Sequence, residues 1–296
     1  MAETGFLERT LTVLRPVLPR RFRGDVPVVP VVRLSGIIGF STPLRPGLTL
    51  ASVAKPLDRA FAWPRARAVA LLINSPGGSA VQSHLIFQRI RQLAAEKERL
   101  VFAFVEDVAA SGGYMIACAA DEIVADPSSI VGSIGVVGAS FGFAKLIDKI
   151  GVERRIYTSG VNKAMLDPFL PEDPEHVARL KAIQDEIHAA FIALVKSRRG
   201  VKLSGPDESL FSGEYWAAGK GMEYGLVDRT GDLRSTLRER YGEKVETPLV
   251  APKTSLFGRT TPGVSAGIGD MLDRPGLTDE LISSLEARAI WARYGL

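Results

Sequence analysis

Residues Val108 to Ala117 read VAASGGYMIA and place one serine and two glycines between two apolar segments. The segment before them, 100–105, is apolar, β-branched and aromatic, which predicts a buried strand. The segment after them, 114–120, is alanine-rich and typical of a buried helix. Ser111 is therefore expected at the start of a helix, where free backbone N–H groups favour developing negative charge. Gly112 and Gly113 are expected to leave room for a substrate to approach it.

A second glycine turn, NSPGGS at 74–79, follows another apolar segment, 68–73, which is also predicted to be a buried strand. A helix over 80–97 separates the two strands. Apolar strands that alternate with helices predict a parallel sheet covered on both faces. Because the carboxyl ends of parallel strands meet at one edge, both turns are expected to open there. Their N–H groups can then form an oxyanion hole for acyl transfer.

The rest of the chain predicts further elements of the same α/β fold. A glycine-rich loop covers 128–142, and an apolar stripe on 174–199 predicts the longest helix, with Asp173 as its N-cap and Pro174 at its first position. Strands are also predicted over 28–40, 122–125 and 154–158, and helices over 50–61, 143–150, 231–241 and part of 213–228.

Composition limits the classes of function. The 296 residues are 46% hydrophobic and 24% charged, which is ordinary for a globular protein. The net charge is only +4 and no long Lys/Arg block occurs, so nucleic acid is not an expected partner. Cys118 is the single cysteine and lies in an apolar run, where it is predicted to be a small core residue. No metal or other cofactor is expected.

A serine nucleophile needs a base, and the three histidines are predicted to be poorly placed for that role. His84, His176 and His188 all fall within predicted helices and are expected on helix surfaces. Lys163 differs, because it follows a predicted strand in a loop of small and apolar residues. Removal of a lysine amine from water lowers its pKa and lets it accept a proton from serine. Lys163 is therefore the candidate base.

Five motifs together resemble the signal peptide peptidase A family of serine–lysine proteases, in the Clp protease/crotonase superfamily. The resemblance covers about residues 28–235. The motifs are NSPGGS, ASGGYMIA, VGSIGVVG, SGVNKAMLDPF and YGLVDRTG.

The resemblance implies a fold, a chemistry and a role for each site residue. The fold would be Clp/crotonase-like, with a mostly parallel sheet and flanking helices. Ser111 would be the nucleophile and Lys163 the general base, with Ser133 orienting the lysine amine. Gly78 and Gly112 would donate the oxyanion N–H groups. The substrates would be extended, apolar polypeptides such as signal-peptide remnants, and the protein would form a ring- or dome-shaped homo-oligomer.

The predicted organisation has four parts: a basic N-terminal arm (1–26), a peptidase domain (27–245), a flexible linker (246–276) and a C-terminal amphipathic helix (277–296). No signal peptide or membrane-spanning run is recognised, unlike in many relatives that carry an anchor. A cytoplasmic location is expected, and peripheral contact of the basic arm with the inner membrane stays open. A further departure is Trp216-Ala-Ala-Gly219, where relatives often read Trp-Thr-Gly.

Two alternatives remain on the sequence alone. A crotonase-type acyl-CoA enzyme would use the same glycine turns to hold a thioester enolate, without a serine nucleophile. A non-catalytic assembly scaffold of the same fold would need neither Ser111 nor Lys163.

Overall fold

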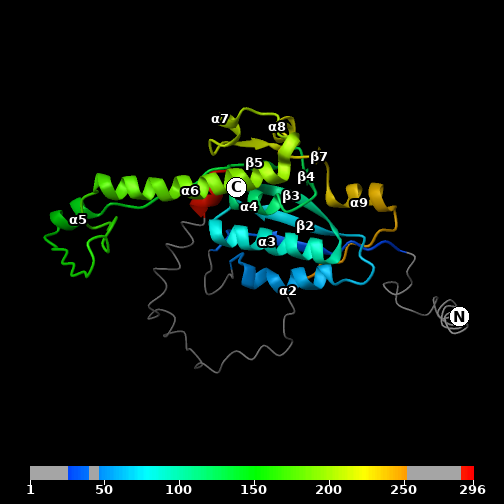
Figure 1. The fold of residues 1–296 in the computed structure, drawn as a ribbon, viewed down its shortest axis with the longest axis horizontal. Coiled ribbons are helices and arrows are strands. Elements are labelled where there is room, and N and C mark those ends of the chain that lie inside the picture. Colours follow the sequence, from blue (N-terminus) through cyan, green and yellow to red (C-terminus); the bar gives the residue numbers. More distant parts are fainter. Residues whose placement is uncertain (1–25, 40–46, 252–287) are drawn as a thin grey trace, which may run out of the picture.

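A mostly parallel sheet forms the centre of the fold (Figure 1). The computed structural model describes residues 26–39, 47–251 and 288–296. Five strands lie in the order β1-β2-β3-β4-β7 and all pair in parallel. β5 pairs with β3 in parallel, and β6 pairs with β5 antiparallel. The strands are β1 (Val31–Ser35), β2 (Ala68–Ser75), β3 (Leu100–Ala110), β4 (Glu122–Ala125), β5 (Ile130–Gly132), β6 (Tyr215–Ala217) and β7 (Arg229–Thr230).

Helices cover both faces of this sheet, because alternate strand residues point to opposite sides. Val69 and Leu71 of β2 join a large core cluster with α2, α3, α4 and the C-terminal half of α6. Ala68 and Ala70 join a smaller cluster that is covered by α9. The predicted α/β class with a mostly parallel sheet is thus confirmed. The helices are α2 (Leu50–Phe61), α3 (Ala80–Lys97), α4 (Gly112–Ala117), α5 (Ala144–Lys149), α6 (Pro174–Arg199), η2 (Gly200–Lys202), α7 (Asp207–Leu210), α8 (Ala218–Glu223) and α9 (Leu233–Tyr241).

β3 is longer than predicted because it serves two neighbours in turn. Its first half, Phe102 to Val105, pairs with β4, and its last residues, Val108 to Ala110, pair with β5. The polar pair Glu106 and Asp107 lies where the sheet divides. The strand therefore continues to the residue before Ser111, and β5, predicted as loop, supports that end.

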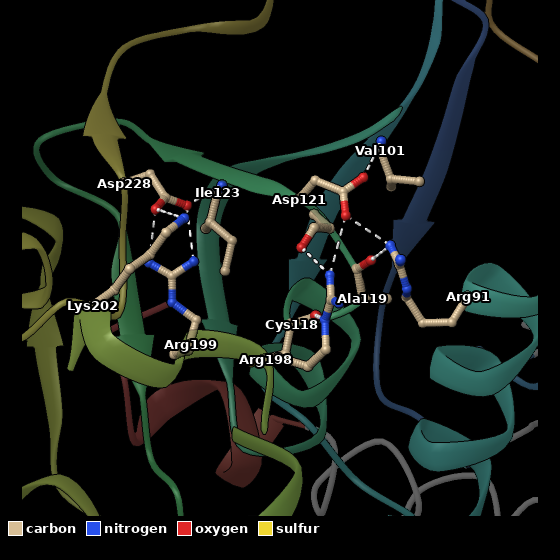
Figure 2. A network of polar contacts seen from close by, with 11 residues as sticks. Arg91, Val101, Cys118, Ala119, Asp121, Ile123, Arg198, Arg199, Lys202 and Asp228 are labelled. Atoms are coloured by element: carbon tan, nitrogen blue, oxygen red, sulfur yellow. Dashed lines mark hydrogen bonds and ion pairs between the residues drawn. The ribbon is translucent and has the colours of Figure 1, made fainter. Parts of the chain in front are cut away.

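The C-terminal end of α6 is fixed to the body of the protein by two arginines (Figure 2). Arg198 donates to the carbonyl oxygens of Cys118 (2.8 Å) and Ala120 (2.9 Å), which follow α4. Arg199 is buried and makes two bonds to the Asp228 carboxylate, at 2.8 and 3.0 Å. As predicted, Asp173 caps the other end of α6, accepting from the Glu175 amide at 2.8 Å.

Four other sequence predictions have clear outcomes. The predicted strand 28–40 is shorter, as β1, and its last residue lies outside the described part. The predicted strand 154–158 is wrong: this stretch pairs with no strand of the described chain, and Tyr157 is 91% exposed. The helix and turn expected in 213–228 include β6 as well as α8. Cys118 is buried as predicted, and burial raises its pKa to about 12.

The structure describes only part of the residues for which the N-terminal and C-terminal predictions were made. Residues 1–25 and 252–287 lie outside the described residues, so the basic arm and most of the linker are not described. Of the predicted C-terminal helix, 288–292 is helical and 293–295 forms a turn. Across the described ranges, no helix combines the length and the apolar character that a membrane crossing requires.

Candidate active site

Ser111 lies between β3 and α4, and its backbone has a conformation that residues with a side chain rarely adopt. Its φ is 52° and its ψ is −121°, and such a conformation costs about 1–3 kcal/mol for a non-glycine residue. The strain is held by neighbours, since the Ser111 amide donates to Gly132 O at 2.8 Å and Ser111 O accepts from the Met115 amide at 2.9 Å. The hydroxyl does not cap the helix. It remains available to a reacting group.

The Gly77–Gly78 turn is held against Ser111 by contacts that only glycine permits. Gly78 has a φ of 140°, and a Cβ there would lie 2.1 Å from Ile38 O. Ile38 donates to Gly77 O and accepts from the Ser79 amide, both at 2.8 Å. These bonds join the turn to Ile38 on both sides of Gly78. A Cβ on Gly77 would lie 2.8 Å from Ser111 Cβ, so the two turns are in direct contact.

Gly112 and Gly113 serve packing rather than substrate access, which corrects the sequence interpretation. A Cβ on Gly112 would meet Ser83 Oγ at 2.2 Å, and a Cβ on Gly113 would meet Ser75 O at 2.4 Å. The missing side chains therefore let α4 approach α3 and β2 closely. The Gly112 backbone still lines the cavity beside Ser111.

One cavity of about 730 Å³ contains four of the five predicted site residues. This volume is in the range of small-molecule and peptide-side-chain sites. Ser111, Ser133, Gly78 and Gly112 all line it, as expected for turns at the carboxyl edge of a parallel sheet. Its walls are mostly apolar. The apolar side chains come from α4 (Met115), the loop after β5 (Val136 and Val137), α6 (Ile187 and Phe191) and the C-terminal residues (Ile290).

Ser133, like Ser111, has a positive φ, at 53°. Its amide donates to Glu214 O at 2.6 Å, so the short antiparallel pair of β5 and β6 holds it in place. Its hydroxyl lies 3.3 Å from the Tyr294 hydroxyl. Two non-glycine residues with strained backbones thus lie in one cavity, a pattern that is common at functional sites.

His188 lies on the surface of α6, as predicted, but it also lines the cavity, so the expectation that it is far from the site is wrong. Its Nε2 lies 3.1 Å from Ile134 O. Because a carbonyl oxygen can only accept, Nε2 is the donor of this bond. The position could have been inferred, since His188 lies three and seven residues before Phe191 and Val195, the buried residues of α6.

Lys163 does not line this cavity. It lies in a segment, residues 136–173, that we call the extension, which projects with α5 beyond the N-terminal end of α6 (Figure 1). Lys163 itself is exposed. Residues 174 and 188 are 14 positions apart on α6, which corresponds to about 21 Å at 1.5 Å per residue. The chain therefore does not bring its own Lys163 to Ser111.

Apart from Val136 and Val137, which line the cavity, the extension has its own contacts. Arg154 pairs with Asp167 at 2.9 Å, and the rings of Phe143 and Phe169 stack at 5.5 Å. The hydrogen bond from the Phe169 amide, followed by the side-chain bond from Arg154, lowers the pKa of Asp167 below its usual value. Among the residues that the structure describes, no group of three or more His, Cys, Asp or Glu side chains is placed to hold a metal ion.

A serine in a strained turn, in contact with a glycine turn at the edge of a parallel sheet, is compatible with acyl-transfer chemistry. The model of peptidase family S49 matches residues 94–245, which is half of this chain. The chain belongs to peptidase family S49, the serine-type family that the motifs indicated.

Individual relatives agree with this family. The putative protease slr0021 of Synechocystis is 33% identical over 220 residues, covering 72% of this chain and 78% of that protein. The chloroplastic serine protease SPPA of Arabidopsis thaliana is 32% identical over 227 residues, covering 73% of this chain and 33% of that protein.

The Na(+)/H(+) antiporter NhaA of Brucella abortus is 56% identical over 290 residues, covering 96% of this chain. The chain spans 39% of the length of that protein. The shared segment includes residues 94–245, the part of the chain that the S49 model matches.

Proposed function

We propose that the chain is a serine endopeptidase that uses Ser111 as nucleophile and Lys163 as general base. The observation that supports the proposal is the contact between the two glycine turns, together with the cavity that Ser111, Gly78 and Gly112 line in common. The mostly apolar walls favour extended, apolar polypeptide substrates.

In this mechanism, Ser111 Oγ bonds to the carbonyl carbon of the scissile peptide while its proton moves to the neutral Lys163 amine. The carbonyl oxygen becomes an oxyanion that accepts from the amides of Gly78 and Gly112. Donors of this kind contribute about 10²–10³-fold to kcat. The lysine then gives the proton to the departing amine, the peptide bond breaks, and an ester to Ser111 remains. Water, deprotonated by the lysine, hydrolyses this ester and restores Ser111.

Because the chain does not bring Lys163 to its own Ser111, we propose that a second copy supplies it. The extension exposes a set of large apolar side chains that a protein acting as a monomer would bury. Among them Phe141 is 74% exposed, Tyr157 91% and Val161 98%. Ile183, on the predicted apolar stripe of α6, is also 54% exposed. A homo-oligomer in which the extension of one copy covers the cavity of the next would bury this surface and complete the dyad.

Covalent labelling tests the dyad. We expect a small fluorophosphonate probe to form one adduct per chain, on the peptide that contains Ser111, because the activated hydroxyl attacks phosphorus as it attacks a carbonyl. Mass spectrometry locates the adduct. Labelling should be lost in Lys163→Ala, although Ser111 is still present.

His188→Gln provides the matched comparison, because His188 carries an imidazole that lines the cavity. If labelling survives Lys163→Ala but is lost in His188→Gln, the base is the histidine and the lysine assignment is wrong. A chain that never labels at Ser111 would support the crotonase or scaffold alternative. The fold of each variant is checked by its thermal transition.

A further inference from the structure

The last nine residues, 288–296, which we call the tail segment, lie against the candidate active site of the same chain. Ile290, Arg293 and Tyr294 line the same cavity as Ser111. The tail segment is drawn in red beside the C-terminal half of α6 and near α4 (Figure 1).

Two tyrosines fix the position of the tail segment. The Tyr215 hydroxyl, on β6, donates to Arg293 O at 2.8 Å, and the Tyr215 and Tyr294 rings meet edge to face at 5.0 Å. The Tyr294 hydroxyl lies 3.3 Å from Ser133 Oγ and 3.5 Å from Pro76 O. Tyr294 thus bridges the two loops that carry Gly78 and Ser133.

The tail segment forms part of the cavity wall in a conformation that is not extended. Residues 288–292 are helical, and the amides of Tyr294, Gly295 and Leu296 return to carbonyls of Trp291 and Ala292. A scissile peptide must be extended so that its carbonyl can reach both the serine and the oxyanion amides. The carbonyls of Trp291 and Ala292 accept bonds within the tail, and Arg293 O accepts from Tyr215, so the tail segment lines the cavity with these three carbonyls already bonded.

The contact with Ser133 gives the tail segment a second effect. The family resemblance implies that the Ser133 hydroxyl orients the amine of Lys163, but here that hydroxyl lies 3.3 Å from the Tyr294 hydroxyl. An incoming lysine needs the space beside Ser133 that the tyrosine ring occupies.

We propose that the tail segment is an intramolecular inhibitor, which competes with polypeptide substrate for the cavity and with Lys163 for Ser133. This inference rests on the proposed peptidase function and adds its regulation. Activity is then expected only when substrate, or the extension of another copy, displaces Tyr294.

The test uses the full chain with Tyr294→Ala, which removes both the ring contact and the hydroxyl contact. We expect kcat/KM for a fluorogenic apolar peptide to rise about tenfold, mainly through a lower KM. Tyr294→Phe removes the hydroxyl alone and should give a rise of about fivefold, the equivalent of one neutral hydrogen bond. Leu296→Ala is the matched control, because Leu296 is 51% exposed and does not line the cavity, and it should behave as the unmodified chain.

Addition in trans completes the experiment. A synthetic peptide with the sequence of the tail segment, RAIWARYGL, should inhibit Tyr294→Ala competitively, whereas the same peptide with phenylalanine in place of tyrosine should inhibit less. Unchanged or lower activity in Tyr294→Ala, or no inhibition by either peptide, would overturn the inference.

Hydrogen exchange measured by mass spectrometry separates this result from a failure of the proposed function. We expect faster exchange in the tail and in the peptide that contains Ser133 when Tyr294 is alanine. If exchange shows that the tail of the unmodified chain is not docked, the inhibitor inference fails while the peptidase proposal stands. If no variant hydrolyses peptide or labels at Ser111, the peptidase proposal fails, and the inhibitor inference fails with it.

Discussion

Ser111→Ala and Lys163→Ala are each expected to lower peptide hydrolysis by at least about 10³-fold, because residues that act as one catalytic unit lose nearly all function when either is removed. Neither change should disturb the fold, since Ser111 makes no side-chain cap bond and Lys163 is exposed in the extension. The measurement is kcat/KM on a fluorogenic apolar peptide, with the thermal transition of each variant as the control for folding.

Mixing the two inactive variants gives the sharper result. If each site combines Ser111 of one copy with Lys163 of another, a Lys163→Ala chain still provides serine and a Ser111→Ala chain still provides lysine. After subunit exchange in equal amounts, half of the serines are intact and half of the neighbouring lysines are intact. About a quarter of the original activity should therefore return.

Chains that carry both substitutions are the control for this mixture, because they provide neither group. They should remain inactive when mixed with either single variant. If the two single variants also remain inactive together, although light scattering shows that they exchange subunits, the lysine does not come from a second copy. The dyad would then require a rearrangement of the extension within one chain.

The sequence predicted the edge of the sheet that carries the site, but not how the base reaches it. The turns that hold Gly78 and Ser111 follow buried strands, and strand direction alone places them together. The residues before Lys163 have β-branched and aromatic character, which predicted a strand at 154–158. A strand needs a partner to satisfy its backbone groups, and the described part of this chain offers none there. Local composition cannot show that a partner is missing.

The tail segment shows a different limit of sequence interpretation. Its apolar periodicity predicted a helix, and 288–292 is helical, but nothing in that pattern indicates where the helix binds. Tyr215 lies 78 residues before Arg293 and 79 residues before Tyr294. These residues meet only because β6 lies beside the cavity. Contacts over such separations depend on the complete fold. Some of the residues that line the cavity therefore lie outside the sequence motifs.

The contacts that anchor α6 were likewise not predicted, although they involve the aspartate of a recognised motif, Asp228 of YGLVDRTG. Three donors converge on this carboxylate (Figure 2): the Arg199 guanidinium, Lys202 Nζ at 2.6 Å and the Ile123 amide at 2.7 Å. Arg199 Nε also donates to Gly225 O at 2.9 Å, so each of the three nitrogens of this buried guanidinium makes a hydrogen bond. This cluster holds the end of the helix that carries His188 and Phe191 into the cavity.

Asp228→Asn is therefore expected to lower the free energy of unfolding by about 3–5 kcal/mol, because it leaves the buried guanidinium of Arg199 without its counter-charge. Urea unfolding followed by circular dichroism measures the loss. Glu223→Gln is the matched control: its ion pair with Lys220 has the same chemistry, at 2.6 Å, but the Glu223 side chain is 65% exposed. Removal of such a surface pair should cost less than about 1 kcal/mol.

The same carboxylate makes a prediction for pH. Burial alone would raise the pKa of Asp228, but the bonds from Arg199, Lys202 and the Ile123 amide outweigh it, and the pKa lies below its usual value. A lowered pKa in the folded state gives stability that is present above the unfolded carboxyl pKa, about 3.9, and is lost as the pH falls through the folded pKa. The difference in stability between the unmodified chain and Asp228→Asn should thus be full at pH 7 and shrink below about pH 4. A difference that stays constant into acid, or one no larger than that of Glu223→Gln, would show that this ion pair does not hold α6 in place.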